Sequence, residues 1–240
     1  MSYFTGSVSA VPTANRQQFH EHAAAHWPMF ESYGASRMIE TWGVDVPRGK
    51  VTDFHGAVQA KDDETIVFSW IEWPDRATAD AAWQKMQSDQ AMQELPRMPF
   101  DGSRMIFGGF DPVFETGRHS GAGYYQGFLL AVPEANRTPY ADMAAEAWTH
   151  FAKGGALGTV EGWGTDVPHG KTTDFYRATK AEDGEVPVFS WIGWPDRATC
   201  DAAAKMMEAE MAGQDMPEMP FDGMRMMWGG FEPLYDSEAV

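Results

Sequence analysis

The chain has 240 residues, of which 43% are hydrophobic and 13% aromatic, so it is long and apolar enough to bury a substantial core. Its net charge of −17 excludes a nucleic-acid partner, because phosphate binding requires clustered Lys and Arg. Cys200 is the single cysteine, so no intramolecular disulfide can form. The N-terminus lacks a signal-peptide pattern, and no apolar run of about 18 residues is present to span a membrane. We therefore expect a soluble cytoplasmic protein with no membrane partner.

Hydrophobic periodicity and turn residues predict five strands and two helices in the first half of the chain. Between Asn15, a suitable N-cap, and Gly34, a suitable stop, apolar side chains recur at helical spacing. The stretch TIVFSWIEW is nearly continuously apolar, which is typical of a strand buried on both faces. Pro74-Asp75 then favours a helix start. The expected strands cover 3–11, 36–43, 53–60, 65–73 and 103–110, and the expected helices cover 15–34 and 75–92.

The second half of the chain repeats the first. A shift of 121 residues aligns Trp42 with Trp163 without a gap, and about half of the aligned positions are identical. A period of this length is far too long for a solenoid and has the size of a small domain. We expect repeat 1 over 1–116, a linker over 117–123 and repeat 2 over 124–240.

The order of elements predicts an α+β fold in which each repeat is ferredoxin-like, βαββαβ with an additional strand. Both helices of such a unit cover one face of its sheet and leave the other face open. The central strand nevertheless carries large apolar groups on both faces, with Phe68 and Trp70 on one and Val67 and Ile71 on the other. The open face therefore needs a cover. We expect the two antiparallel sheets to pack face to face as an intramolecular pseudo-dimeric α+β barrel.

Four motifs shared by the two halves resemble those of domain-of-unknown-function family 1428, the YbaA-like bacterial proteins. They are VPxAN, WGxDVPxGKxTDF, VFSWIxWPDRAT and MPFDGxRMxxGGFxP, and together they cover nearly all of both copies. The resemblance implies a fold of the dimeric α+β barrel kind, which antibiotic-biosynthesis-type monooxygenases also use. It implies a fused pseudo-dimer, and it implies no activity.

Gly170-Lys171-Thr172 is superficially like a nucleotide-binding loop. A phosphate loop requires four residues between its two glycines, but five separate Gly164 from Gly170, and repeat 1 has Val51 in place of the hydroxyl residue. We expect residues 173–178 to form a strand, so that no helix N-terminus follows the loop. The pattern therefore predicts a turn and no nucleotide site.

Three histidines cluster on the first helix. His22 and His26 are four residues apart and could together hold a metal, whereas repeat 2 has Met143 and Ala147 at these places. A site needs three or four ligands, and no cysteine lies nearby in the sequence. We expect solvated histidines, including His20, and neither a metal nor a tightly bound cofactor.

Polar side chains set into apolar strands are the candidate ligand-binding residues. Alternation puts Glu40 on one face with Trp42, while Ser69 lies inside the most apolar strand and Arg104 begins the last one. Glu40 and Arg104 form either a structural ion pair or part of a polar site with the carboxylate as base or acceptor. We expect the glutamates to be largely buried and to face the barrel interior. With their repeat mates, the candidates are Glu40, Trp42, Ser69, Arg104, Glu161, Trp163, Ser190 and Arg225.

Three functions are compatible with this pattern, and no catalytic residue is assigned. The first is binding of a small apolar or aromatic molecule in the barrel interior. The second is a small cofactor-independent enzyme resembling the antibiotic-biosynthesis-type monooxygenases, by analogy of fold alone. The third is a non-catalytic assembly module, in which the repeated residues serve folding alone and further homo-oligomers could form. A cavity lined by Glu40, Trp42 and Ser69 would favour ligand binding, whereas a solid interior would favour the assembly module.

Overall fold

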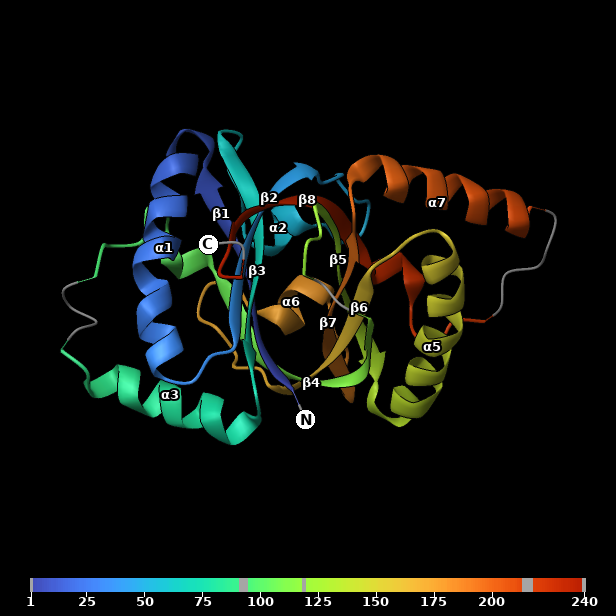
Figure 1. Ribbon diagram of the computed structural model, residues 1–240. Helices are drawn as coiled ribbons and strands as arrows, with labels where there is room; N and C mark the ends of the chain where they lie inside the picture. Colours follow the sequence, from blue (N-terminus) through green and yellow to red (C-terminus); the bar gives the residue numbers. More distant parts are fainter. Residues whose placement is uncertain (1, 91–94, 118–119, 213–217, 239–240) are drawn as a thin grey trace.

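The computed structural model describes residues 2–90, 95–117, 120–212 and 218–238, and it contains one closed barrel of antiparallel strands (Figure 1). Repeat 1 contributes β1 (Tyr3–Pro12), α1 (Arg16–Ser32), β2 (Arg37–Asp45), α2 (Phe54–Ala57), β3 (Glu64–Trp73), α3 (Arg76–Ser88) and β4 (Ile106–Gly117). Repeat 2 contributes β5 (Tyr124–Pro133), α5 (Arg137–Lys153), β6 (Gly158–Asp166), α6 (Phe175–Thr179), β7 (Glu185–Trp194), α7 (Arg197–Met211) and β8 (Met227–Asp236).

Each repeat supplies half of the barrel. The strand order is β4-β1-β3-β2 in repeat 1 and β8-β5-β7-β6 in repeat 2, which is the order of a ferredoxin-like sheet. Two hydrogen-bonded seams join the halves, β2 with β8 and β4 with β6. The closed sheet has no free edge and so avoids the unpaired backbone groups of an open one. The expected α+β fold, a pseudo-dimeric barrel within one chain, is confirmed.

Prolines mark irregular points of both seams. In β4 the register with β6 shifts between Pro112 and Phe114. In β2 the register with β8 shifts between Glu40 and Thr41, and Thr41 lies opposite Pro233. A proline has no N–H to give to a ladder, so it is tolerated at such bulges.

Aromatic side chains of the two repeats meet face to face inside the barrel. The rings of Phe68 and Phe189 stack with centroids 4.1 Å apart, and those of Trp70 and Trp191 stack at 4.4 Å. These four side chains are at most 1% exposed. A Cβ on Gly6 would lie 2.9 Å from the Phe189 ring, so glycine is needed there for the ring to approach the strand. The barrel interior is a packed aromatic core.

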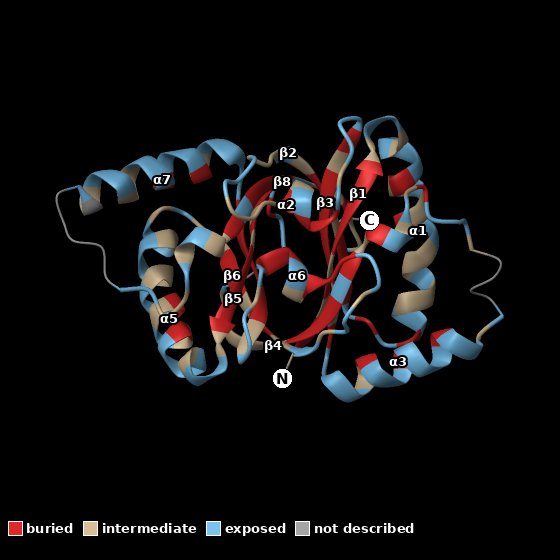
Figure 2. Ribbon diagram, turned by 180° about the vertical axis from the view of Figure 1, so that it is seen from behind, coloured by how far each residue is buried: buried red, intermediate tan, exposed pale blue. Residues whose placement is uncertain are grey.

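Helices cover the outside of the barrel. In Figure 1, α1 and α3 lie on the side of repeat 1 and α5 and α7 on the side of repeat 2, while α2 and α6 lie near the middle. Figure 2 shows buried strands in the centre and exposed surfaces on the outer helices. Phe54 of α2 and Phe175 of α6 are fully buried members of the interior core. The molecule therefore has two kinds of apolar space: the barrel interior and the spaces between the outer helices and the sheet.

The additional strand expected over 53–60 is instead the short helix α2. The Asp53 side chain caps it by accepting a hydrogen bond from the Gly56 backbone N–H, and the apolar residues Phe54, Ala57 and Val58 are all buried. Helical rather than alternating spacing of these residues explains the difference.

Other boundaries differ less from the expectation. The second helix, expected over 75–92, ends at Ser88, and residues 91–94 lie outside the described part of the chain. The last strand begins at Ile106, because Gly102–Arg104 form a 3-10 turn capped by the Asp101 side chain.

The boundary between the repeats falls between β4, which ends at Gly117, and β5, which begins at Tyr124. The seams hydrogen-bond the two repeats into one barrel. The division of the chain into two domains stays a prediction. Across the described ranges, no helix has the length and apolarity that would let it cross a bilayer.

Candidate functional site

Glu40, Trp42 and Ser69 lie on the outer face of the barrel, toward α1. Their neighbour Ile39 belongs to the interior core, so strand alternation turns Glu40 and Trp42 outward. Trp42 packs there against Phe19 of α1. The expectation that Glu40 faces the barrel interior is wrong. The prediction that Glu40 and Trp42 share a face of β2 was correct. That face, however, is buried under the apolar face of α1, and the aliphatic Ile39 points into the barrel interior.

The same arrangement recurs in repeat 2. Val160 belongs to the interior core, whereas Trp163 packs outside it with Tyr140 of α5. Glu161 and Ser190 lie opposite each other in the register of β6 and β7. The structure thus brings together a glutamate and a serine between a helix and the outer sheet face of each repeat.

In repeat 1 a serine hydroxyl of β3 binds the carboxylate. Ser69 Oγ donates a hydrogen bond to Glu40 Oε2. The Glu40 side chain is buried, and this burial raises its pKa to about 7, although the Ser69 hydrogen bond opposes the rise. Position 19, which faces the carboxylate from α1 in the repeat alignment, is Phe19 and has no hydroxyl.

In repeat 2 a tyrosine joins the pair. Tyr140 Oη donates to Glu161 Oε2 over 2.5 Å and lies 3.5 Å from Ser190 Oγ. Burial raises the pKa of Glu161, while hydrogen bonds from Ser190, Tyr140 and Thr159 oppose the rise. Burial and the adjacent Glu161 carboxylate raise the pKa of Tyr140 well above its usual range, so the phenol stays protonated and acts as a donor.

A cavity of about 210 Å³ opens beside this group between α5 and the sheet. Its polar atoms come from Tyr140, Glu161, Ser190 and Thr159, and Trp163 is not part of the wall. The Trp163 ring instead stacks under the Arg137 guanidinium, 5.6 Å away. The apolar wall consists of Phe128, Leu130, Met143, Ala144, Ala147, Phe151, Ile192, Met219, Phe221 and Met226. The arrangement is a mostly apolar pocket with a few converging polar groups, as is typical of small-molecule sites.

Arg104 is not part of this site. Its guanidinium forms a bidentate pair with Glu64, with Nη2–Oε1 and Nη1–Oε2 distances of 2.6 and 2.8 Å, and its Nε lies 3.0 Å from Asp101. Hydrogen bonding from Arg104 lowers the pKa of Glu64. The sequence hypothesis that paired Glu40 with Arg104 is therefore wrong, because Arg104 lies in the turn before β4 and meets the first residue of β3.

Arg225 repeats this arrangement. It pairs with Glu185 at 2.6 and 2.8 Å and with Asp222 at 2.9 Å. Both arginines hold the turn before the last strand to the start of the central strand of their repeat. Both arginines therefore have a structural role. Alternation along a strand does not indicate which carboxylates they pair with.

His22 and His26 are partly buried rather than solvated. Their ring centroids are 3.9 Å apart, and burial, reinforced by the neighbouring His26, lowers the pKa of His22 to about 4. The atom His22 Nδ1 is buried and has no hydrogen-bond partner among the described residues. Both rings occupy the positions that Met143 and Ala147 take in the wall of the repeat 2 cavity.

A signal for the histidines was present in the sequence. Phe19, His22, Ala23 and His26 follow the i, i+3, i+4, i+7 spacing of a helix face that packs on a sheet. In the described residues no three His, Cys, Asp or Glu side chains come close enough together to hold a metal ion.

The loop containing Gly170 is followed by α6, not by the expected strand over 173–178. The Asp174 carboxylate caps this helix by accepting from the Arg177 backbone N–H at 2.8 Å, and it also accepts from the Gly170 N–H at 3.1 Å. The loop backbone is thus bound to its own aspartate. The absence of nucleotide binding stays a prediction.

The family described as "Protein of unknown function (DUF1428)" matches residues 2–102 and 123–223. "Uncharacterized protein YbaA" of Escherichia coli strain K12 is 50% identical over 116 residues, which cover 48% of this chain and 99% of the relative. YbaA of Shigella flexneri matches with the same values.

Solved structures with similar folds share little sequence with the chain. An "anthrone oxidase-like protein" has a TM-score of 0.56 at 10% identity, covering 98% of this chain and 92% of the other. A "Putative monooxygenase" from Fusobacterium nucleatum has a TM-score of 0.54 at 9% identity, covering 98% and 93%. At these identities the likeness extends to the fold alone. The two matched regions, by contrast, span most of the sequence, and the chain belongs to the DUF1428 family with two copies of the domain in tandem.

Proposed function

We propose that the protein binds a small, mostly apolar molecule in the cavity between α5 and the sheet of repeat 2. The observation that carries this proposal is the hydrogen-bonded group of Tyr140, Glu161 and Ser190 beside an otherwise apolar cavity of about 210 Å³. Burying a carboxylate among apolar side chains is costly, and folding alone would be better served by an apolar residue there.

The size of the cavity limits the ligand. An apolar cavity of about 150 Å³ accommodates benzene in another protein, so a cavity of about 210 Å³ suits a ligand with one or two fused rings. The polar group adds a requirement for orientation. A ligand hydroxyl can donate to Glu161 or accept from Ser190, so we expect an aromatic alcohol to bind more tightly than the corresponding hydrocarbon.

The test compares 2-naphthol with naphthalene. Methyl NMR of the methionines reports the location, because Met143, Met219 and Met226 line the repeat 2 cavity. We expect 2-naphthol to shift these three signals saturably, and Glu161→Gln to weaken its binding about fivefold without affecting naphthalene. The matched control is Glu40→Gln, the same change in repeat 1. Saturable shifts confined to other methionines, or equal effects of the two variants, would place the ligand elsewhere.

A second candidate is proton abstraction without a cofactor, with Glu40 as the base. It is supported by the pKa of about 7 for Glu40, because a general base works best when its pKa is near the operating pH. The neighbour described as anthrone oxidase-like supports testing anthrone as substrate. We expect oxygen uptake with anthrone to rise as pH increases through about 7 and to be lost in Glu40→Gln. Uptake that is unchanged in the variant would remove this candidate. If 2-naphthol also failed to bind, the assembly module, which the packed barrel interior favours, would remain.

A further inference from the structure

Three methionines line the repeat 2 cavity: Met143 of α5, Met219 at the start of the MPFDG turn, and Met226 directly before β8. Met143 and Met226 are half-buried, whereas Met219 is 41% exposed. Every other described residue of the cavity wall is buried or half-buried. The Met219 side chain therefore borders both the cavity and the solvent.

The MPFDG turn holds the Met219 side chain at this place. Asn136 Nδ2 donates to the Pro220 carbonyl at 2.8 Å, which ties the turn to the start of α5. The ion pairs of Arg225 hold the other end of the turn. The terminal methyl Cε of Met219 lies against Gly223, where an added Cβ would stand 2.4 Å from it. The absence of a side chain at Gly223 thus lets the thioether fold onto its own turn at the edge of the cavity.

A thioether that solvent can reach is a target for peroxides. A sulfur lone pair attacks one peroxide oxygen and the O–O bond breaks. The leaving hydroxide takes the proton of the transferred hydroxyl and departs as water, so sulfur is oxidised by two electrons and the peroxide is reduced. Methionine sulfoxide is polar, and burying its oxygen in an apolar wall is unfavourable. The oxidised side chain should therefore turn toward water and leave the wall of the cavity incomplete.

Repeat 1 offers a matched methionine outside this cavity. Met98 begins the same turn, is 51% exposed, and lies against Gly102 as Met219 lies against Gly223. Its Cε would be 2.7 Å from a Cβ at Gly102. Met98 can therefore be oxidised under the same conditions without changing the wall of the repeat 2 cavity.

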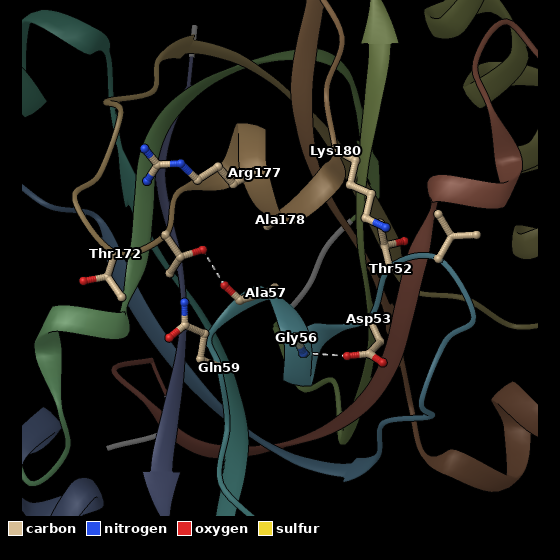
Figure 3. Close-up of a pocket in the computed structure, with 11 residues that line it drawn as sticks. Thr52, Asp53, Gly56, Ala57, Gln59, Thr172, Arg177, Ala178 and Lys180 are labelled. Carbon is tan, nitrogen blue, oxygen red and sulfur yellow. Dashed lines mark hydrogen bonds between the residues drawn. The ribbon is translucent and has the colours of Figure 1, made fainter.

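A larger cavity, of about 310 Å³, lies at α2 and α6 and has a different wall. Figure 3 shows its polar and small side chains, with Thr173 Oγ1 donating to the Ala57 carbonyl at 2.8 Å. No sulfur atom belongs to the residues that the structure places around it, which are Val51, Thr52, Asp53, Gly56, Ala57, Gln59, Thr172, Thr173, Arg177, Ala178 and Lys180. Thioether oxidation acts directly on the repeat 2 cavity and not on this one.

We propose that Met219 is a site of reversible oxidation by peroxides, and that its sulfoxide form weakens ligand binding in the repeat 2 cavity. Because it concerns the same cavity, this inference rests on the proposed function and adds a redox control to it. The cavity holds its ligand while Met219 is reduced and releases it after oxidation. Methionine sulfoxide reductases would restore the thioether.

The first measurement locates the added oxygen. The full chain is treated with hydrogen peroxide, and peptide mass spectrometry follows the oxidation of each methionine with time. We expect Met219 to be oxidised well before Met143 and Met226, because these two are less exposed. Bound 2-naphthol should slow the oxidation of Met219 and leave that of Met98 unchanged. Oxidation of Met219 no faster than that of Met143 would overturn the inference.

The second measurement is the affinity for 2-naphthol before and after peroxide treatment, compared within each variant. We expect a loss of about fivefold in the unmodified protein, because a polar group then disturbs an apolar wall. Met98→Leu and Met224→Leu should show the same loss, since both keep Met219, and Met224 is 67% exposed but lies outside the wall. Met219→Leu should show no loss. An equal loss in Met219→Leu, or none in the unmodified protein, would contradict the inference.

Ligand binding and oxidation can fail separately. If 2-naphthol does not bind the untreated protein, the proposed function is wrong, and methyl NMR tests the oxidation site alone. Oxidation of Met219 should then shift the methyl signals of Met143 and Met226 and leave that of Met38, which is buried in repeat 1, unchanged. Unmoved signals of Met143 and Met226 would remove the inference as well. If 2-naphthol binds but oxidation does not weaken it, the inference alone is wrong.

Discussion

The helix–sheet spaces of the two repeats share a glutamate and a serine and differ in what the helix adds. Repeat 1 presents Phe19 to Glu40, and repeat 2 presents the Tyr140 hydroxyl to Glu161. Repeat 1 also places two histidine rings where repeat 2 has Met143 and Ala147. A few helix positions therefore determine how many hydroxyl groups hydrogen-bond to the buried carboxylate. The glutamate and the serine on the strands are the same in both repeats.

In the barrel interior, unlike the helix–sheet spaces, the two repeats contribute matching aromatic side chains. Substitutions there should have the largest effect on the free energy of unfolding. Phe68→Ala and Phe189→Ala each remove one ring of the central stack, and each should lower the free energy of unfolding by about 3–5 kcal/mol. Because the two rings are equivalent, the losses should agree within about 1 kcal/mol. Chemical denaturation measures both. A clearly unequal pair would show that the repeats differ in the core as well as in the sites.

The two glutamates should respond differently to pH. Glu40 has a pKa of about 7 when folded and 4.5 as its ordinary value, so the folded state binds its proton more tightly. The contribution of this group to stability is therefore present below about pH 4.5 and is lost as pH rises to about 7. Glu40→Gln should remove this loss and raise the free energy of unfolding at pH 8 by up to about 3 kcal/mol.

Glu161→Gln should give a smaller gain at pH 8, because Tyr140 and Ser190 already stabilise the carboxylate. The measurement is urea denaturation of the two variants and the unmodified protein from pH 4 to 8. A larger gain for Glu161→Gln than for Glu40→Gln would mean that the two hydroxyl groups do not stabilise the Glu161 carboxylate.

Exchanging the helix residue should exchange the environments. Tyr140→Phe removes the donor to Glu161 and should raise the pKa of that carboxyl further. Phe19→Tyr should lower the pKa of Glu40, because Phe19 packs near Phe100 at 5.7 Å as Tyr140 packs near Phe221 at 5.9 Å. NMR titration of the carboxyl carbons measures both shifts. If the pKa of Glu40 stayed at its present value, the new hydroxyl would not reach the carboxylate.

The smallest effect is expected in the loop before α6. Lys171 is exposed, so its side chain packs against little of the fold. Lys171→Ala should change the free energy of unfolding by no more than about 0.5 kcal/mol, as should Lys50→Ala in the matching loop. Thermal melts are sufficient to test this. A loss above about 1 kcal/mol in one loop alone would reveal a further difference between the repeats.

Most of the fold could be predicted from the sequence because it depends on repetition and periodicity. The ungapped repeat and the strand that is apolar on both faces were enough to predict the pseudo-dimeric barrel. The element over 53–60 was misassigned, because a four-residue helix held by the Asp53 cap shows its helical spacing over a single turn only.

The site was predicted less well, for a physical reason. Strand alternation determines which residues share a face, so the prediction that Glu40 lies on the same face as Trp42 was correct. Both faces of β2 carry buried apolar side chains, however, and the sequence alone does not determine which face the second repeat covers. The contribution of Tyr140 depends on how α5 is set against β6, which is a tertiary property. Arg104 was assigned by its position in the chain, although its partner Glu64 lies 40 residues away.

The link from β4 to β5 frees the barrel from the constraint of symmetry. In a barrel assembled from two identical chains, every substitution is made twice, once on each side of the axis. Two arginine or two lysine side chains facing each other across that axis would repel. In a fused chain each position can change alone, so a lysine such as Lys180 can stand where the other repeat has the neutral Gln59. Residues related by the pseudo-twofold axis can therefore come to differ in charge and size, which they cannot do in a dimer of identical chains.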